Sequence, residues 1–405
     1  MNIRVTPSIA RGAVSAPPSK SMAHRWLLCA ALADGESRID GVSDCEDVQA
    51  TLDCLRAMGV QCCQRENTVT VTGADLTAST DKKRILPCRE SGSTMRFLLP
   101  LCLLSGECST LSGASSLLRR PMTVYRDLCQ EHNLFFEQTA DGITVKGPLT
   151  AGDYTLPGDV SSQFISGMLF ALTKVKGESI LHVLPPFESR SYVLLTLQTL
   201  CAFGADISWI DECTLRICGG KPMQAQNVTV EGDYSGAAFL SALHALGGDV
   251  TVTNLNPASL QGDRVYLQHF EALQQGFATI SVADCPDLAP IMFALAAKGH
   301  GARFTDTRRL VIKESNRAQT MAAELRKFGT TVDVYDNEVI ITPTSFHEPA
   351  EPLMGHNDHR IVMSLTVLST LTGGIIEGAE AVAKSFPDFF ERICALGIQI
   401  EEITQ

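Results

Sequence analysis

The sequence predicts an α/β protein of two lobes, each built from three copies of a β-α-β-α-β-β unit. Two observations support this prediction. The chain has 405 residues, too many for one hydrophobic core, and one pattern of helices and strands recurs six times along it. Apolar residues make up 45% and charged residues 19%, which are ordinary values for globular proteins and exclude disordered or fibrous structure.

Each copy begins with a polar start, an apolar helix-like run, a glycine and a short β-branched strand. The first four glycines, Gly35, Gly106, Gly177 and Gly248, are 71 residues apart, and the last two intervals are 51 and 75 residues. The six segments are 22–41, 94–113, 163–183, 236–255, 287–306 and 361–380. A second amphipathic stretch with strands after it is visible at 51–73, 196–219, 321–343 and 389–403. Each unit therefore spans roughly seventy residues.

Six units divide naturally into two lobes of three. The chain is expected to cross between them near 220–232, after the third unit. An N-terminal strand over Ile3–Ile9 is left over and is expected to complete the second lobe, with a second crossing near 13–18. The predicted lobes are residues 18–231 and residues 1–17 with 232–405. Two linkers of this kind permit closure of the lobes around a ligand.

The composition excludes several classes of partner. The 33 Lys and Arg residues against 45 Asp and Glu give a net charge of −12, which disfavours binding to nucleic acid or to an anionic membrane. The longest apolar run, Phe97–Leu104, is far too short to span a membrane, and no signal sequence is visible. The fourteen cysteines form no CxxC pair, which favours reduced, mostly buried thiols over disulfides or zinc. We expect a cytoplasmic protein.

Polar clusters precede the first helix of every unit, at 19–21, 90–93, 161–163, 231–235, 284–287 and 357–360. Helix capping explains the Ser, Asp and Asn residues among them. It does not explain the cations Lys20, Arg25, Arg96 and Arg360, because the helix dipole is positive at its N-terminus. Helix N-termini with added cations are typical of sites for phosphate or carboxylate. The sequence therefore favours a small substrate with several negative charges.

Further cations follow at Arg119-Arg120, Arg308-Arg309, Lys313, Arg317 and Lys384. Lys313 and Arg317 stand four apart at the expected start of a helix, a spacing that also suits a solvated helix face. The chain contains no Walker loop, no GxGxxG fingerprint and no HExxH, GxSxG or EF-hand pattern, which leaves nucleotide hydrolysis and metalloprotease chemistry without support.

Eight motifs in order along nearly the whole chain resemble those of the 5-enolpyruvylshikimate-3-phosphate synthase family. Residues 18–25 (PSKSMAHR) are similar to its PGSKSxSNR, residues 90–96 (ESGSTMR) to NAGTxMR, and residues 161–163 and 231–235 to SSQ and EGDxS. Pro286-Asp287, 313–317 (KESNR), 358–360 (DHR) and 384–388 (KSFPD) resemble the PD, KETDR, DHR and KTFPD elements.

The resemblance implies an inverse α/β barrel of two pseudo-threefold lobes, the architecture that the repeats predict independently. It implies transfer of the enolpyruvyl group of phosphoenolpyruvate to the 5-hydroxyl of shikimate 3-phosphate, with release of phosphate. It implies that the protein is a monomer and that it uses neither a metal nor an organic cofactor. Lobe 18–231 would mainly bind shikimate 3-phosphate, and the other lobe mainly phosphoenolpyruvate.

The resemblance also implies site residues. The shikimate 3-phosphate set is Lys20, Ser21, Arg25, Ser161, Ser162, Gln163, Ser189, Tyr192, Asp287 and Lys313. The phosphoenolpyruvate set is Lys20, Gly92, Arg120, Gln163, Arg317, Arg360 and Lys384. Asp287 is the candidate base at the 5-hydroxyl, and Glu314 with Lys20 or Lys384 are the candidates for proton transfer to carbon, an assignment that sequence leaves open.

Three departures from the family motifs bear on the site. His24 replaces the usual Asn, and its titration could add pH dependence to the reaction. Glu90 replaces an Asn beside the expected phosphate, which places an anion near an anion unless the side chain points away. Asn316 replaces an acidic residue between Glu314 and Arg317.

Two other functions compete with this interpretation. The enolpyruvyl transferase that acts on UDP-N-acetylglucosamine shares the six-unit fold, but it typically carries a reactive Cys in the loop that corresponds to Leu111–Met122, where this chain has none. A non-catalytic anion-binding protein of the same fold would be expected to lose Lys20, Glu314 or Lys384, and all three are present.

Overall fold

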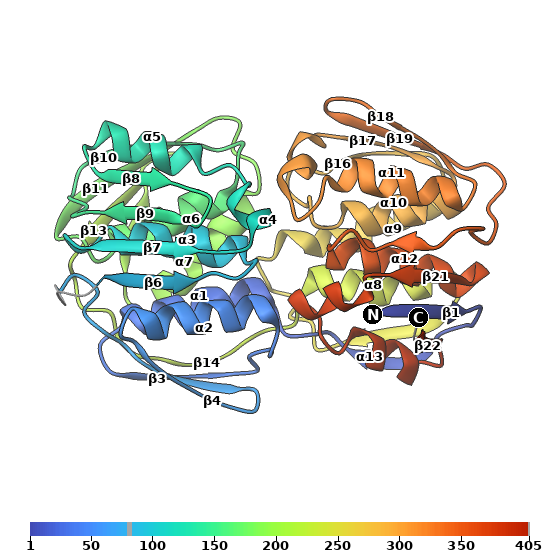
Figure 1. Cartoon of the computed structure of the whole chain (residues 1–405), viewed down its shortest axis with the longest axis horizontal. Helices are drawn as coiled ribbons and strands as arrows, with labels where there is room; N and C mark the ends of the chain where they lie inside the picture. Colours follow the sequence, from blue (N-terminus) through green and yellow to red (C-terminus); the bar gives the residue numbers. More distant parts are fainter. Residues whose placement is uncertain (79–82, 404–405) are drawn as a thin grey trace. The chain divides into compact units, whose positions relative to one another are not determined.

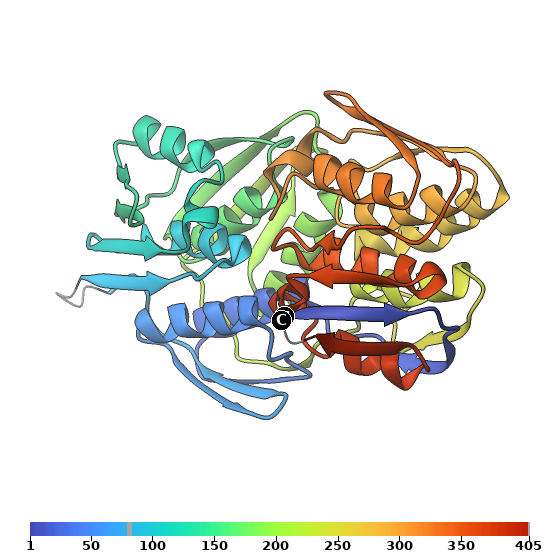
Figure 2. The same ribbon diagram turned by 45° about the vertical axis from the view of Figure 1, so that its right-hand side comes forward.

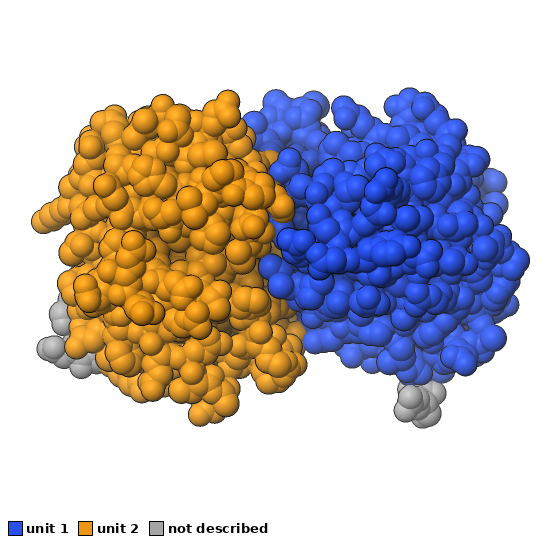
Figure 3. Space-filling view, turned by 90° about the horizontal axis from the view of Figure 1, so that it is seen from above, with its two compact units in different colours: residues 1–17, 232–405 blue, residues 18–231 orange. Residues whose placement is uncertain are grey.

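The computed structural model describes residues 1–78 and 83–403. The chain forms two compact units (Figure 3). Unit 1 comprises Met1–Pro17 and Gly232–Gln405, and unit 2 comprises Pro18–Glu231. Each unit has its own hydrophobic core.

The first sheet of unit 2 has the strand order β14-β3-β5-β4. Its strands are β3 (Glu36–Asp40), β4 (Gln61–Arg65), β5 (Thr68–Thr72) and β14 (Asn227–Thr229), and its helices are α1 (Lys20–Leu32) and α2 (Glu46–Ala57). β14, from the end of the unit, pairs in parallel with β3, whereas β5 is antiparallel to β3 and to β4.

The other two sheets of unit 2 repeat this order as β6-β7-β9-β8 and β10-β11-β13-β12. The second repeat contains β6 (Arg84–Pro87), α3 (Gly92–Cys102), β7 (Cys108–Ser112), α4 (Ser115–Leu118), α5 (Thr123–Glu131), β8 (Phe135–Gln138) and β9 (Ile143–Lys146). The third contains β10 (Asp153–Pro157), α6 (Ser162–Leu172), β11 (Gly177–Leu184), α7 (Arg190–Ala202), β12 (Asp206–Trp209) and β13 (Thr214–Gly219).

In unit 1, the fifth repeat has a sheet of the same kind, in the order β16-β17-β19-β18, and the last repeat has another, in the order β20-β21-β1-β22. The fifth repeat contains β16 (Ala278–Ser281), α10 (Ala289–Lys298), β17 (Ala302–Thr305), η2 (Arg308–Ile312), α11 (Arg317–Lys327), β18 (Thr331–Val334) and β19 (Glu338–Thr342). The last repeat contains β20 (Leu353–Met354), α12 (His359–Thr372), β21 (Gly374–Glu377), η3 (Ala379–Lys384), α13 (Phe389–Ala395) and β22 (Gln399–Ile403).

The N-terminal strand completes the sheet of the last repeat. β1 (Asn2–Thr6) lies between β21 and β22 and is antiparallel to both, with Asn2 opposite Glu377 and Ile403. Figure 2 shows this blue strand between the two red ones, and Figure 1 shows the two chain ends close together. The strand ends at Thr6, before the predicted boundary at Ile9.

The fourth repeat differs from the prediction. It contains β2 (Arg11–Ser15), α8 (Tyr234–Ala245), β15 (Asp249–Thr253), η1 (Gly262–Val265) and α9 (Tyr266–Gln275), and its sheet has only the two strands β2 and β15. The prediction of a terminal strand pair is wrong here, because the 51-residue glycine interval leaves too little chain for it. A pocket of about 250 Å³ lies beside α8, α9 and α10, lined by Leu246, Phe270, Leu273 and Leu295 among others.

The first helix of each repeat is buried on nearly all sides. In α12 every residue from His359 to Thr370 is buried, and in α1 every residue from Met22 to Leu32. Such helices, apolar on most faces, form the centre of a unit, and only their first residues can present polar groups to a ligand. Of the fourteen cysteines seven are buried, so the prediction of mostly buried thiols is only half right. Within the described part of the chain, no helix has both the length and the apolar character needed to cross a membrane.

Candidate active site

The polar clusters lie at the helix starts, as predicted. Side chains cap five of the six central helices: Ser19 caps α1, Ser91 α3, Ser161 α6, Asp233 α8 and Asp358 α12. α10 is the exception, because its N-cap residue Leu288 makes no side-chain cap. The nearby Asp287 instead contacts three cations. Capping therefore explains most of the Ser and Asp residues and leaves Asp287 to another role.

Lys20 opens α1 and pairs with an acid that the sequence did not single out. Its Nζ lies 2.8 Å from Oδ2 of Asp47 on α2, and the two side chains are only 13% and 12% exposed. This contact fixes the ammonium at the first turn of α1 while leaving part of it accessible.

Arg25 lies one turn further along α1 and is almost fully buried. Its Nε donates to Thr196 Oγ1 (2.8 Å), its Nη1 to the carbonyl of Ser21 (2.7 Å) and its Nη2 to the carbonyl of Tyr192 (2.9 Å). Because these acceptors carry no formal charge, they do not neutralise the guanidinium. Burial lowers the pKa of Arg25 to about 10, so the group stays cationic at neutral pH.

Gln163 links the starts of α6 and α3. Its Oε1 accepts from Arg96 Nη1 and its Nε2 donates to Ser93 Oγ, both at 2.8 Å. Ser161 accepts a hydrogen bond from the Gln163 backbone N–H at 3.3 Å, and Ser162 is the first residue of α6. Ser189 is buried, with a left-handed φ of 52°, immediately before α7. The structure thus brings Ser21, Arg25 and Tyr192 together and, separately, Gln163, Ser93 and Arg96.

Gly92, the first residue of α3, lies against Arg120. A Cβ on Gly92 would lie 2.7 Å from Arg120 Nη1. Two of the departures from the family motifs, Glu90 in unit 2 and Asn316 in unit 1, have local partners. Glu90 Oε1 accepts a hydrogen bond from Ser116 Oγ at 3.3 Å, and Asn316 caps α11 by accepting from the Gln319 N–H at 3.3 Å.

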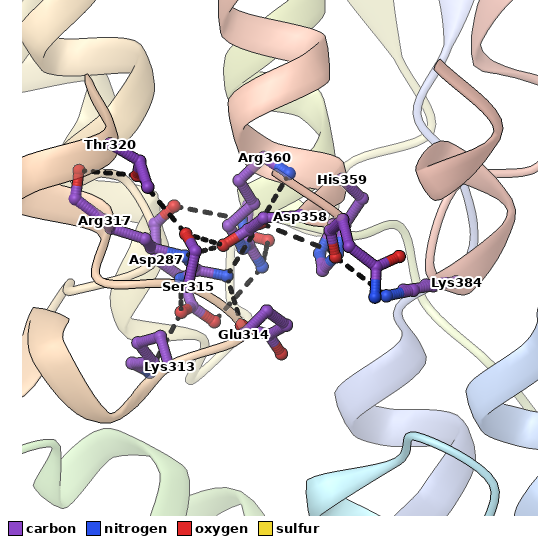
Figure 4. A network of polar contacts seen from close by, with 12 residues as sticks. Asp287, Lys313, Glu314, Ser315, Arg317, Thr320, Asp358, His359, Arg360 and Lys384 are labelled. Carbon is purple, nitrogen blue, oxygen red and sulfur yellow. Dashed lines mark hydrogen bonds and ion pairs between the residues drawn. The ribbon is translucent and has the colours of Figure 1, made fainter. Parts of the chain in front are cut away.

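In unit 1, Asp287 is the centre of a cluster of charges (Figure 4). Its Oδ1 lies 3.1 Å from Lys313 Nζ and 2.8 Å from Arg317 Nη1, and its Oδ2 lies 3.1 Å from Arg360 Nη2. Arg360 also donates to the Asp287 carbonyl at 3.0 Å and to Ser235 Oγ at 2.8 Å. Lys313 precedes α11 and Arg317 begins it, so the pair is not a solvated helix face.

These cations determine the ionisation of Asp287. Burial by itself raises the pKa of the carboxyl, but Arg360, Lys313 and Arg317 outweigh burial and hold its pKa well below the ordinary value. The pKa of Lys313 is lowered, because burial outweighs the attraction of Asp287. Asp287 is therefore an anion at neutral pH.

Arg317 is held by three carboxylates. Its Nε lies 2.9 Å from Asp358 Oδ2, its Nη2 lies 2.6 Å from Glu314 Oε2, and its third partner is Asp287. Asp358 is fully buried, accepts from Ser315 Oγ at 3.1 Å and also caps α12 through the Arg360 N–H at 3.0 Å. One buried carboxylate thus orients both Arg317 and the start of the helix that carries Arg360.

Lys384 joins this group through the backbone. Its Nζ donates to the Asn357 carbonyl at 2.7 Å. Asn357 and His356 both have left-handed φ values, 53° and 50°. His356 Nε2 lies 2.8 Å from Oε1 of the buried Glu324, which fixes the turn that presents the carbonyl to Lys384.

The sequence did not indicate Asp47, Thr196 or Glu324, and Ser235 and Asp358 appeared only as parts of motifs. Each of the five orients a predicted site residue, or the turn beside one, through a hydrogen bond to a residue at least 27 positions away in sequence. In the residues that the structure describes, no group of three or more His, Cys, Asp or Glu side chains is arranged to hold a metal.

The expectation that His24 titrates during the reaction is not supported. Burial, together with the nearby Lys20 and Arg25, holds the pKa of His24 well below its ordinary value, so the imidazole is neutral near pH 7.

A buried neutral histidine should make unit 2 less stable in acid. The unfolded chain binds a proton at His24 as the pH falls through about 6.5 and the folded chain does not, so stability is lost below that pH. The loss between pH 7.5 and 5.5 should be about 1.4 kcal/mol larger for the wild type than for His24→Asn. The two tryptophans, Trp26 and Trp209, lie in unit 2, so urea unfolding followed by their fluorescence reports on this unit. Equal pH dependence for the two proteins would contradict a neutral His24.

Three comparisons agree on the relatives of this chain. The sequence model of the family described as EPSP synthase (3-phosphoshikimate 1-carboxyvinyltransferase) matches residues 6–279 and 269–393. The chain is 36% identical to the 3-phosphoshikimate 1-carboxyvinyltransferase of Clostridium kluyveri, over 99% of this chain and 98% of that one. It is 32% identical to the Clostridium botulinum protein of the same name, over 98% of each chain.

A solved structure of EPSP synthase from Acinetobacter baumannii has the same architecture. It superimposes with a TM-score of 0.79 at 26% identity and covers 99% of both chains. The predicted fold class of two lobes of repeated α/β units is confirmed by this likeness.

Proposed function

The chain belongs to the EPSP synthase family, and on that premise we propose how its residues divide the work of the reaction. The enzyme transfers the enolpyruvyl group of phosphoenolpyruvate to the 5-hydroxyl of shikimate 3-phosphate and releases phosphate. The observation that carries this function is the full-length match to enzymes of that name. The same match disfavours the UDP-N-acetylglucosamine transferase, as does the absence of Cys from Leu111–Met122.

We propose that unit 2 mainly binds shikimate 3-phosphate. Ser161, Ser162 and Gln163 offer hydroxyl, amide and helix N-terminal N–H groups suited to phosphate, and Arg25 offers an uncompensated guanidinium suited to an anion. Arg25 is held by the backbone carbonyls of Ser21 and Tyr192. Ser189 immediately precedes α7, the helix that contains Tyr192.

We propose that phosphoenolpyruvate is held by Arg120, Arg317, Arg360 and Lys384, by Lys20 and Gln163, and by the backbone N–H groups at Gly92. Arg317 already binds three carboxylates, so an incoming carboxylate competes with them for the guanidinium. Asp287 is the partner shared by Arg317 and Arg360, and is more exposed than Asp358. When the incoming carboxylate takes the place of Asp287 on Arg317 and Arg360, Asp287 loses cations that depress its pKa and becomes a stronger base at the 5-hydroxyl. Lys313 contacts the shikimate side.

The chemistry requires an acid, a base and cations. A proton adds to the methylene carbon while the 5-hydroxyl loses its proton and its oxygen bonds to the neighbouring carbon. The resulting tetrahedral intermediate then loses phosphate and a methyl proton. Asp287 takes the hydroxyl proton, and Glu314 with Lys20 or Lys384 transfers a proton to the methylene carbon. Most of the acceleration comes from the fixed placement of two anions and from cations that stabilise the developing charge.

Gly92→Ala should weaken the binding of phosphoenolpyruvate and of glyphosate. The new methyl group would lie 2.7 Å from Arg120 Nη1 and push the guanidinium away from the start of α3. We expect the phosphoenolpyruvate KM to rise about 10- to 100-fold, the range that a misplacement of about 1 Å produces. Gly106→Ala is the control, because a Cβ there meets nothing within 4 Å. Unchanged affinity for both ligands would reject the placement of phosphate at Gly92.

We further propose that the enzyme works as a cytoplasmic monomer, without a metal or cofactor, and without nucleic acid or membrane as a partner. The acidic net charge of −12 supports the last two points. Size-exclusion chromatography with light scattering tests the monomer, and a dimer would reject it.

Phosphate release tests the function. The protein is incubated with phosphoenolpyruvate, with and without shikimate 3-phosphate, in the presence of a chelator. Release that requires shikimate 3-phosphate and survives the chelator is expected. Release triggered by UDP-N-acetylglucosamine instead would move the assignment to the other transferase, and no release with either acceptor would reject the catalytic role.

A further inference from the structure

A chain of buried hydrogen bonds connects three helices of unit 2. His24 Nδ1 on α1 lies 2.8 Å from Thr51 Oγ1 on α2, and Thr51 Oγ1 lies 2.7 Å from Thr94 Oγ1 on α3. Thr94 Oγ1 donates to Ser91 Oγ at 2.8 Å, and Ser91 is the N-cap of α3. All four side chains are 1% exposed. We call these four residues the His24–Ser91 relay.

The relay also reaches the partner of Lys20. Thr94 Oγ1 lies 3.3 Å from the backbone carbonyl of Asp47, whose carboxylate holds Lys20 at 2.8 Å. Lys20 and His24 are four residues apart on α1, and Asp47 and Thr51 are four apart on α2, so each pair shares one helix face. The contacts therefore close a ring through α1, α2 and α3.

Each end of the relay adjoins a different substrate set. His24 is next to Arg25, which belongs to the shikimate 3-phosphate set alone, whereas Lys20, one turn earlier on α1, belongs to both sets. Ser91 and Thr94 flank Gly92 and Ser93, where the phosphate of phosphoenolpyruvate is placed. α2 packs against both α1 and α3 and is the spacer between them.

We propose that the His24–Ser91 relay is a positioning device that sets the separation of the two substrate sites, and that Thr51 is its central positioning residue. The relay touches neither substrate itself. Hydroxyl groups accept and donate at once, so each bond in such a chain strengthens the next, and a buried chain tolerates little change in length. A displacement of about 1 Å between reacting groups lowers the rate about 100-fold, so a fixed separation of the two sites preserves the reaction rate.

The residue types fit this role. His24 and Ser91 stand where the family motifs have Asn and Ala, so both ends of the relay are features of this chain. The Nδ1 of His and the amide atoms of Asn are the same number of bonds from Cβ. Asn at position 24 can therefore keep the contact with Thr51, whereas Leu, of similar size, cannot.

The test measures both KM values in each variant, with the other substrate saturating. Thr51→Val removes the central hydroxyl and keeps the shape of the side chain, and Thr51→Ser is the matched control that keeps the hydroxyl. We expect Thr51→Val to raise the KM of both substrates about tenfold and Thr51→Ser to change neither by more than about twofold.

The cross-effects are the decisive result. Thr94→Val should raise the KM of shikimate 3-phosphate, although Thr94 lies beside Gly92 of the phosphoenolpyruvate set. His24→Leu should raise the KM of phosphoenolpyruvate, although its neighbour Arg25 belongs to the shikimate 3-phosphate set alone. A purely structural relay would lower the melting temperature and leave both KM values unchanged, and that result would overturn the proposal. If Thr51→Val does not fold, the pair His24→Leu and His24→Asn decides the same question.

This inference rests on the proposed function, and the experiment separates the two. A wild type without phosphate release dependent on shikimate 3-phosphate would reject the function. An active wild type whose variants show no cross-effect would reject only the relay.

Discussion

Asp287→Asn should lower kcat about 10²- to 10⁴-fold without raising the KM of phosphoenolpyruvate, because it removes a base and not a cation. The carboxylate contacts Lys313, Arg317 and Arg360, and an amide of the same size keeps one acceptor oxygen among them. Loss of the carboxylate charge leaves the cluster one charge more positive, which favours the binding of an anionic substrate. A fall in kcat with an equal or lower KM therefore distinguishes a base from a binding group.

Asp284→Asn is the matched control for this variant. Asp284 lies three residues earlier, in the segment before α10, and is exposed. We expect nearly wild-type kinetics from it, with both variants assayed by phosphate release. A kcat for Asp287→Asn within about tenfold of the wild type would contradict its role as the base, since general bases contribute at least about 100-fold.

Asp358→Asn should destabilise unit 1 by about 3–5 kcal/mol, the usual cost of removing one partner of a buried ion pair. Asn caps helices as well as Asp does, so the start of α12 should survive and the loss should come from Arg317. The two carboxylates left to Arg317, Asp287 and Glu314, are both more exposed than Asp358. We therefore also expect Arg317 to shift and the KM of phosphoenolpyruvate to rise.

Calorimetry measures this loss, because the two tryptophans lie in unit 2 and do not report on unit 1. Asp233→Asn is the control. Asp233 caps α8 through the N–H groups of Ser235 and Gly236, at 2.8 and 3.1 Å, so its substitution should cost well under 1 kcal/mol. Equal destabilisation by the two substitutions would show that capping alone accounts for Asp358.

Local chemistry explains why much of the fold could be read from the sequence. Ser and Asp side chains at helix starts cap the helix regardless of what surrounds it, so Ser19, Ser91 and Asp358 mark α1, α3 and α12. The repeat then gives the order of elements, and the unpaired N-terminal strand predicts the closure of the last sheet. The short fourth repeat was visible as a 51-residue interval, but only the structure shows that the missing residues are a strand pair.

The partners of the site residues could not be predicted in this way. Arg25 and Thr196 are 171 residues apart, and Arg317 and Asp358 are 41 apart. Nothing in the spacing of such residues indicates that they meet, because tertiary packing of different repeats brings them together. The prediction that His24 titrates was wrong, because the sequence does not show that the side chain is buried beside two cations.

Solvent deuterium incorporation distinguishes addition and elimination from other routes, because the proposed reaction must protonate the methylene carbon before phosphate leaves. The enzyme is incubated with both substrates in D₂O, and the products are examined by proton NMR. We expect deuterium in the methylene group of the enolpyruvyl product, and none in phosphoenolpyruvate incubated without shikimate 3-phosphate. Product that forms with phosphate release but without deuterium would contradict addition and elimination at this site.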